Sequence, residues 1–102
     1  MKARPVVFSP EAQDDLRILG DWIAERAGPA TALRYLARLE AACLGLSTAS
    51  ERGRRRDDIR PGLRVVGFER RITIAFVISQ TQVTILRLHY GGADWDRKSD
   101  PI

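Results

Sequence analysis

The chain has 102 residues, 44% of them hydrophobic and 29% charged, which is enough for one small domain. A single cysteine, Cys43, and a single histidine, His89, exclude a disulfide framework and the zinc sites built from several cysteines or two histidines, so we expect no metal and no cofactor. No apolar run approaches the roughly 18 residues of a membrane span, and the first five residues lack a secretion signal. We therefore expect a cytoplasmic protein without a membrane partner.

The net charge of +4 is distributed unevenly along the chain. Arginine supplies 15 of the 17 basic residues. Residues 10–28 carry a net charge of −3, whereas residues 51–71 carry +4. Such asymmetry fits a charged partner, either nucleic acid or an acidic protein segment, and it equally fits a solvated basic loop.

The first 46 residues indicate a short strand followed by two helices. Residues 6–8 form a β-prone apolar run, Ser9 and Pro10 are typical of a helix start, and Gly28 is typical of a helix end. Apolar residues recur every three or four positions in each helix, at Ala12, Leu16, Leu19 and Ile23 and then at Ala32, Leu36, Leu39, Cys43 and Leu46. Because Pro29 begins the second helix directly after Gly28, we expect an antiparallel helical hairpin.

Residues 47–62 lack periodicity and predict a loop, in which Asp57 and Asp58 can pair with the arginines that precede them. Three β-branched runs follow at residues 63–68, 71–78 and 83–90, joined by connections of hairpin length. The predicted fold is therefore α+β, a single domain over residues 1–102 in the order β-α-α-β-β-β. The helical hairpin packs on one face of an antiparallel sheet, and residues 93–102 form a polar tail.

Strand alternation predicts which side chains the helical hairpin leaves uncovered. Alternate residues of a strand point to opposite faces, and the helices can cover only one of them. The uncovered face is expected to hold Val66, Phe68, Val77 and Ile85, edged by Arg64, Arg71, Arg87 and His89. An apolar face edged by arginines is typical of a docking surface, and a dimer interface or a tail that folds back would also explain it.

A metal-independent ribonuclease is the one enzyme class for which the chain offers candidates. It needs groups that accept and donate protons, together with cations for the developing phosphate charge. His89 with Arg64, Arg71 and Arg87 is the candidate set, and Tyr90 is the remaining proton donor. Because neighbouring strand residues point to opposite faces, His89 and Tyr90 do not share a site. We therefore expect no catalytic residue and interpret His89 as a histidine at the sheet edge.

Five segments follow one another in an order and spacing that resembles a known family. They are FSPEA at 8–12, RDDIRPGLR at 56–64, ITIAF at 72–76, VTILR at 83–87 and YGGADW at 90–95. The chain resembles the RelE/ParE superfamily of bacterial toxins and, within it, the ParE-like branch. Ala93 departs from the pattern, because many relatives carry a basic residue there.

The resemblance implies a type II toxin that a cognate antitoxin neutralises in a hetero-oligomer. RelE-like members cleave messenger RNA on the ribosome, whereas ParE-like members inhibit DNA gyrase and are not nucleases. Since the candidate residues of this chain favour gyrase inhibition over RNA cleavage, we expect gyrase as the target. We expect no sequence-specific contact with nucleic acid. A ribosome-dependent mRNA endonuclease and a non-toxic module that only binds antitoxin remain the alternatives.

Two contact regions follow from the resemblance and the uncovered face together. We expect the antitoxin to bind that face, at Arg64, Val66, Phe68, Arg71, Val77, Ile85 and Arg87. The resemblance implies that the C-terminal region acts on gyrase. We therefore expect Asp94 and Trp95, in a tail whose net charge of −1 does not attract phosphate, to contact the target.

Overall fold

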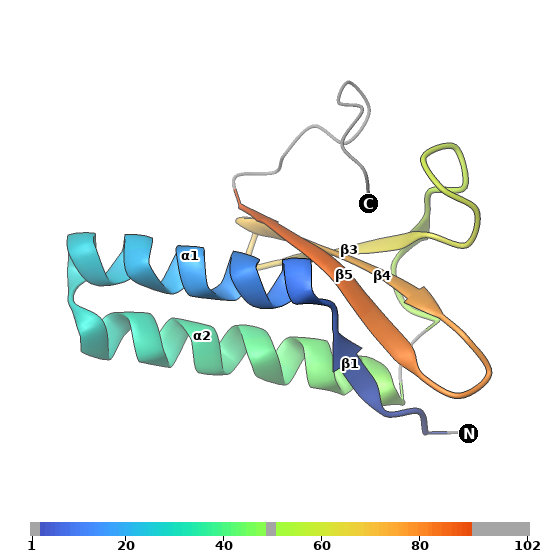
Figure 1. Ribbon diagram of the computed structural model, residues 1–102, viewed down its shortest axis with the longest axis horizontal. Helices are drawn as coiled ribbons and strands as arrows, with labels where there is room; N and C mark the ends of the chain where they lie inside the picture. Colours follow the sequence, from blue (N-terminus) through green and yellow to red (C-terminus); the bar gives the residue numbers. More distant parts are fainter. Residues whose placement is uncertain (1–2, 49–50, 91–102) are drawn as a thin grey trace.

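The helices and strands follow the predicted order, with one additional strand. The computed structural model describes residues 3–48 and 51–90. Its elements are β1 (Val6–Phe8), α1 (Pro10–Ala27), α2 (Pro29–Leu44), the 3₁₀-helix η1 (Gly45–Ser47), β2 (Arg54–Arg55), β3 (Arg64–Phe68), β4 (Ile72–Ile78) and β5 (Val83–Tyr90) (Figure 1). The α+β fold and the helical hairpin on a sheet are confirmed.

Helix α1 begins at a serine that also fastens it to the sheet. The Ser9 hydroxyl accepts a hydrogen bond from the Ala12 N–H at 3.0 Å and donates one to the Leu86 carbonyl at 2.9 Å. The Ser9 N–H donates to the Ile85 carbonyl at 2.9 Å. At the other end Gly28, with a φ of 92°, lets the chain reverse so that α2 starts at the next residue. The start of α1 is thus held against β5.

The sheet is mixed rather than antiparallel, which corrects the prediction. Its strand order is β1-β5-β4-β3-β2, and Val6–Phe8 pair in parallel with Val83–Ile85. The other three pairings are antiparallel. Because the chain reverses at each hairpin, β5 runs in the same direction as β3, and β1 runs parallel to both.

The additional strand β2 lies within the predicted loop. Arg54 and Arg55 pair with Val65 and Arg64 of β3. Gly53 precedes them with a φ of 94°, and a Cβ atom there would come within 2.7 Å of the Val65 carbonyl oxygen, so only glycine fits. A two-residue strand made only of arginines carries no apolar alternation, which explains why the sequence did not reveal it.

The predicted pairing of arginines with the following aspartates is confirmed. Arg55 binds Asp57 at 3.1 Å and Arg56 binds Asp58 at 2.8 Å. Asp57 also accepts a hydrogen bond from the Gly62 N–H at 2.8 Å. These contacts order the loop that connects β2 to β3.

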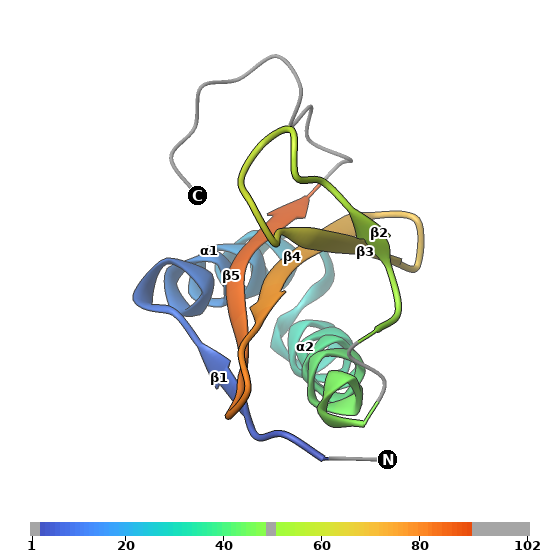
Figure 2. The same ribbon diagram turned by 90° about the vertical axis from the view of Figure 1, so that its right-hand side faces the viewer.

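The helix-facing side of the sheet forms the main core. The predicted apolar stripes of both helices pack against β4 and β5, and Leu39, Cys43, Ile74 and Phe76 are almost fully buried. Figures 1 and 2 show both helices on this side of the sheet. Burial raises the pKa of the Cys43 thiol to about 12, so Cys43 is a core residue and not a reactive one.

Four residues predicted to be uncovered lie instead on the helix-facing side. Val66 and Phe68 pair across β3 and β4 with Ile74 and Ile72 and pack on the main core. Arg64 shares their face, opposite Phe76. Ile85 also faces the helices and is fully buried, because a β-bulge at Leu86 shifts the alternation of β5 by one residue. The prediction placed these four on the wrong face.

The far side of the sheet holds a second, smaller core. Leu63, Val65 and Ala75 are buried there, with Ile59, Val77 and Leu86 packed around them. Ile59 belongs to the loop between β2 and β3, which lies on the side of the sheet opposite the helices (Figure 2). The prediction of a far side without cover is therefore wrong over this area.

Candidate functional site

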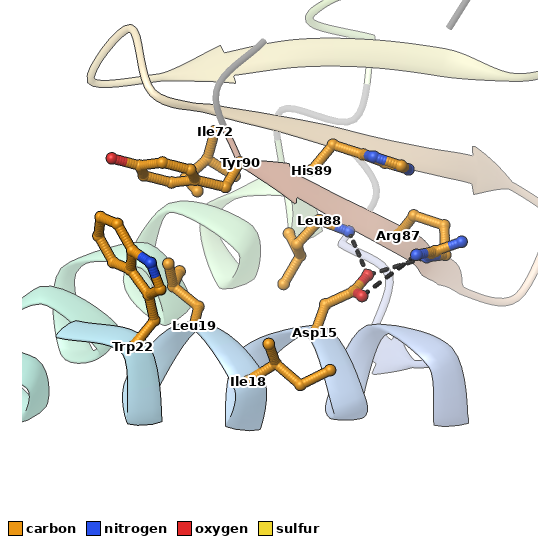
Figure 3. A pocket seen from close by; sticks show the side chains of 9 residues that line it. All are labelled: Asp15, Ile18, Leu19, Trp22, Ile72, Arg87, Leu88, His89 and Tyr90. Carbon is orange, nitrogen blue, oxygen red and sulfur yellow. Dashed lines mark hydrogen bonds and ion pairs between the residues drawn. The ribbon is translucent and has the colours of Figure 1, made fainter. Parts of the chain in front are cut away.

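A pocket of about 350 Å³ opens between α1 and the second half of β5. Strand β1 pairs only with residues 83–85, so the rest of the β5 edge lies beside α1 instead of another strand. The lining residues are Asp15, Ile18, Leu19, Trp22, Ile72, Arg87, Leu88, His89 and Tyr90 (Figure 3). We refer to this site as the α1–β5 pocket.

Three large apolar side chains at the rim of this pocket are exposed. Ile18 is 57% exposed, Trp22 39% and Tyr90 41%. The Trp22 and Tyr90 rings lie 5.0 Å apart at an angle of 48°, and the Arg26 guanidinium lies 4.1 Å above the Trp22 ring. Exposed aromatic rings beside an apolar hollow and a cation are characteristic of protein-binding surfaces.

A nearly buried ion pair closes the other end of the pocket. Asp15 accepts hydrogen bonds from Arg87 Nε at 2.9 Å and Nη2 at 3.3 Å, and from the Leu88 N–H at 2.9 Å (Figure 3). The side chain of Asp15 is only 13% exposed and that of Arg87 25%. The carboxylate therefore neutralises Arg87 and also satisfies a backbone donor at the edge of β5.

A tight turn borders the pocket at the Tyr90 end. Glu69 and Arg70, between β3 and β4, both have positive φ angles, 50° and 61°. Arg38 of α2 binds Glu69 through two hydrogen bonds of 2.9 and 3.2 Å, and this contact lowers the pKa of the Glu69 carboxyl. Arg71 donates to the Tyr90 hydroxyl at 3.4 Å. Glu69, Arg70, Arg71 and Tyr90 line a second hollow, which we call the turn hollow.

The four ribonuclease candidates are not brought together. Arg64 binds the side chain and carbonyl of Glu51, both at 3.1 Å, and Arg87 binds Asp15. His89 lies opposite Thr73, and Figure 3 shows it on the other side of β5 from Leu88. Two of the three arginines are thus paired with carboxylates, and only Arg87 lines the same pocket as the histidine. Among residues 3–48 and 51–90, no three acidic, histidine or cysteine side chains gather to hold a metal ion.

The predicted antitoxin-binding residues are also dispersed. Val66, Phe68 and Ile85 belong to the main core and Val77 to the second core. Of the three arginines in this predicted set, Arg71 is exposed, whereas Arg64 and Arg87 are partly buried. The predicted target-binding residues Asp94 and Trp95 lie outside the described residues. The structure therefore assembles a different surface from the one that the sequence predicted.

The residues that do form a surface left a weak signal in the sequence. Ile18 and Trp22 are four positions apart on α1, outside its buried stripe, so they share a separate flank of that helix. Tyr90 joins them only because β5 ends beside that flank, which alternation within one strand does not reveal.

A family model described as the ParE toxin of type II toxin–antitoxin systems, parDE, matches residues 6–95. The chain belongs to this family. Its fold is similar to that of the chromosomal ParDE toxin–antitoxin system from P. aeruginosa, with a TM-score of 0.76 and 22% identity over 86% of this chain and 96% of the other. It is also similar to the toxin–antitoxin complex RelBE2 from Mycobacterium tuberculosis, with a TM-score of 0.64 and 23% identity over 98% and 97% of the two chains.

No curated protein sequence is significantly similar to this ParE-family toxin. The two structural likenesses, at such low identity, establish the fold of the toxin. Neither helix in the described part of the chain has the length and apolarity needed to cross a membrane.

Proposed function

We propose that this ParE-family toxin acts in the bacterial cytoplasm by binding and inhibiting DNA gyrase, and that a cognate antitoxin neutralises it by covering the α1–β5 pocket. The observation that carries the proposal is the exposed group of Ile18, Trp22 and Tyr90 around an apolar hollow. Such a surface suits burial against another protein.

The dispersal of the ribonuclease candidates supports a binding mechanism. General acid–base cleavage needs its proton-transfer groups and cations within hydrogen-bond reach of one phosphate. Here Arg64 and Arg87 are committed to Glu51 and Asp15. A cleavage mechanism would have to break both ion pairs before these arginines could act together with His89.

The proposal moves the antitoxin contact away from the surface expected from sequence. The apolar residues of that surface belong to the two cores, so their substitution tests folding more than binding. They are Val66, Phe68, Val77 and Ile85. Arg71 remains a contact residue, because it is exposed and touches Tyr90 at the rim of the pocket. The apolar side chains that meet the antitoxin become Ile18 and Trp22.

The antitoxin contact is tested by an arginine substitution at Ile18. The purified product of the adjacent gene is titrated calorimetrically with the wild-type toxin, with Ile18→Arg and with Leu33→Arg as a matched control. Leu33 is 70% exposed on α2 and does not line the pocket. Ile18→Arg should weaken binding by at least about tenfold, a typical loss for a central interface residue, whereas Leu33→Arg should bind like the wild type. Equal losses in both variants would place the contact elsewhere.

The tail supplies the proposed gyrase contact through Asp94 and Trp95. Deleting residues 93–102 should abolish growth arrest and leave antitoxin binding intact, because the described lining of the α1–β5 pocket lies between Asp15 and Tyr90. The melting temperature of the truncated chain is the control for folding. A large drop in that temperature would make Trp95 a structural residue, contrary to the proposal.

A further inference from the structure

We propose that Arg70 and Arg71, with the Tyr90 hydroxyl, form an anion-binding site that takes a carboxylate from an acidic and apolar segment of the antitoxin. This inference rests on the proposed function, since it adds a second contact for the same partner. The site is the turn hollow, about 410 Å³ in volume, which shares Tyr90 with the α1–β5 pocket. One bound segment can therefore reach both.

The backbone of the turn places two residues other than glycine in the left-handed region. A two-residue hairpin loop with positive φ at both positions is normally built from asparagine and glycine. Glu69 and Arg70 occupy these positions with φ angles of 50° and 61°. Residues held in this way store backbone strain, which is concentrated at functional sites. The fold alone would be served better by glycine at position 70.

The charges around the turn hollow favour an incoming anion. Glu69 is the acidic residue of the lining, and its carboxylate is occupied by the two hydrogen bonds from Arg38. Among the described residues, the hydrogen bond of the Arg71 side chain is a long contact of 3.4 Å with the Tyr90 hydroxyl, and its charge also acts on Glu69. Arg70 makes no hydrogen bond or ion pair with any residue of 3–48 or 51–90. Two guanidinium groups and a hydroxyl can thus donate hydrogen bonds to a carboxylate.

The neighbouring pocket favours a peptide over nucleic acid as the carrier of this anion. Its lining is mainly apolar, with Leu19, Ile72 and Leu88 behind the exposed rim. A nucleic-acid strand needs a row of cations along successive phosphates. Of the charged residues in its lining, Asp15 and Arg87 are paired with each other. In an antitoxin segment, an apolar side chain would fit the α1–β5 pocket, and an acidic side chain next to it would fit the turn hollow.

The test uses the full toxin and the purified product of the adjacent gene in calorimetric titrations. Arg70→Gln and Arg70→Gly should each weaken binding about 10- to 100-fold, the usual effect of losing a hydrogen bond to a charged group. The matched control is Arg34→Gln, because Arg34 is an exposed arginine on α2 whose one described contact is Thr31 at 3.3 Å. Its affinity should equal that of the wild type. The loss at Arg70 should shrink as salt is added.

Melting temperatures of the same variants separate binding from folding. Arg70→Gly should melt at the same temperature as the wild type or higher, since glycine accepts the positive φ without strain. Wild-type affinity in both Arg70 variants would overturn the anion site and leave the proposed function standing. An equal loss of affinity in Arg34→Gln would also overturn the anion site. The same conclusion would follow if the Arg70 variants lost binding to a DNA oligonucleotide and kept wild-type affinity for the antitoxin. A wild-type toxin that does not bind the antitoxin would overturn both proposals.

Discussion

Asp15 of α1 and Arg87 of β5 form a two-hydrogen-bond ion pair across 72 residues of sequence, and the same carboxylate binds the Leu88 N–H. The pair can form because β1 covers the edge of β5 only at residues 83–85, so the Arg87 side chain, which stands opposite Ala75, reaches past the uncovered edge to α1. It fixes the width of the α1–β5 pocket at one end. It also removes from the surface an arginine that alternation alone would expose.

The first prediction concerns this pair. Asp15→Asn should destabilise the fold by about 2 kcal/mol, because it removes the charge that accepts hydrogen bonds from the Arg87 guanidinium and the Leu88 N–H. Asp14→Asn is the matched control, since Asp14 lies 3.9 Å from Arg17 with both side chains largely exposed. The control should change stability by less than about 0.5 kcal/mol. Urea denaturation measures both values, and equal effects would show that the Asp15 pair stabilises nothing.

A second prediction follows from the glycine before β2. Gly53→Ala should destabilise the fold by about 1 to 3 kcal/mol, because it combines a positive φ with a close approach to the Val65 carbonyl. Gly45→Ala should be neutral or stabilising, since Gly45 has helical angles and open space around its Cα. Thermal unfolding of the two variants makes the comparison. A neutral Gly53→Ala would mean that β2 does not pair with β3 as described.

The third prediction uses the buried thiol. The pKa of Cys43 is about 12 in the folded chain and 9.0 when unperturbed, so the unfolded chain loses its proton first as the pH rises. The contribution of Cys43 to stability is therefore complete below pH 9 and falls by about 1.4 kcal/mol per pH unit above it. The stability difference between wild type and Cys43→Ala should shrink between pH 9 and pH 11. A constant difference over this range would contradict the buried position of the thiol.

The fourth prediction concerns the loop over the second core. Hydrogen bonds from Arg55 and the Gly62 N–H lower the pKa of Asp57 below its ordinary value of 3.8. The ionised form is the one that holds the loop, so this contact persists above pH 3.8 and is lost as the pH falls through the lowered value. The amide NMR signal of Gly62 should titrate with a midpoint below 3.8. A midpoint at or above that value would show that Asp57 does not hold the loop.

Sequence patterns predicted the helices and the three long strands because each has a clear period and clear ends. Ser9, Pro10 and Gly28 marked the helix boundaries, and β5 was located at its actual residues. The orientation of strand faces was not predictable in the same way. In β3 both faces are apolar, with Val65 on one and Val66 on the other, so alternation does not say which one meets the helices.

The candidate site was missed for a related reason. The bulge at Leu86 reverses the alternation of β5 part-way along, so Ile85 and Leu88 share a face although they are three residues apart. The pocket depends on this local irregularity and on the packing of α1 beside it. Neither has a period that a sequence pattern can show.

The central claim is that the toxin acts by binding gyrase and not by catalysis, and a paired assay of wild type and His89→Ala tests it most directly. Each purified toxin is added to a gyrase supercoiling reaction and to ribosomes translating a defined messenger. We predict that both proteins inhibit supercoiling to the same extent and leave the messenger intact. Cleavage of the messenger by the wild type, lost in His89→Ala and accompanied by normal supercoiling, would contradict the account.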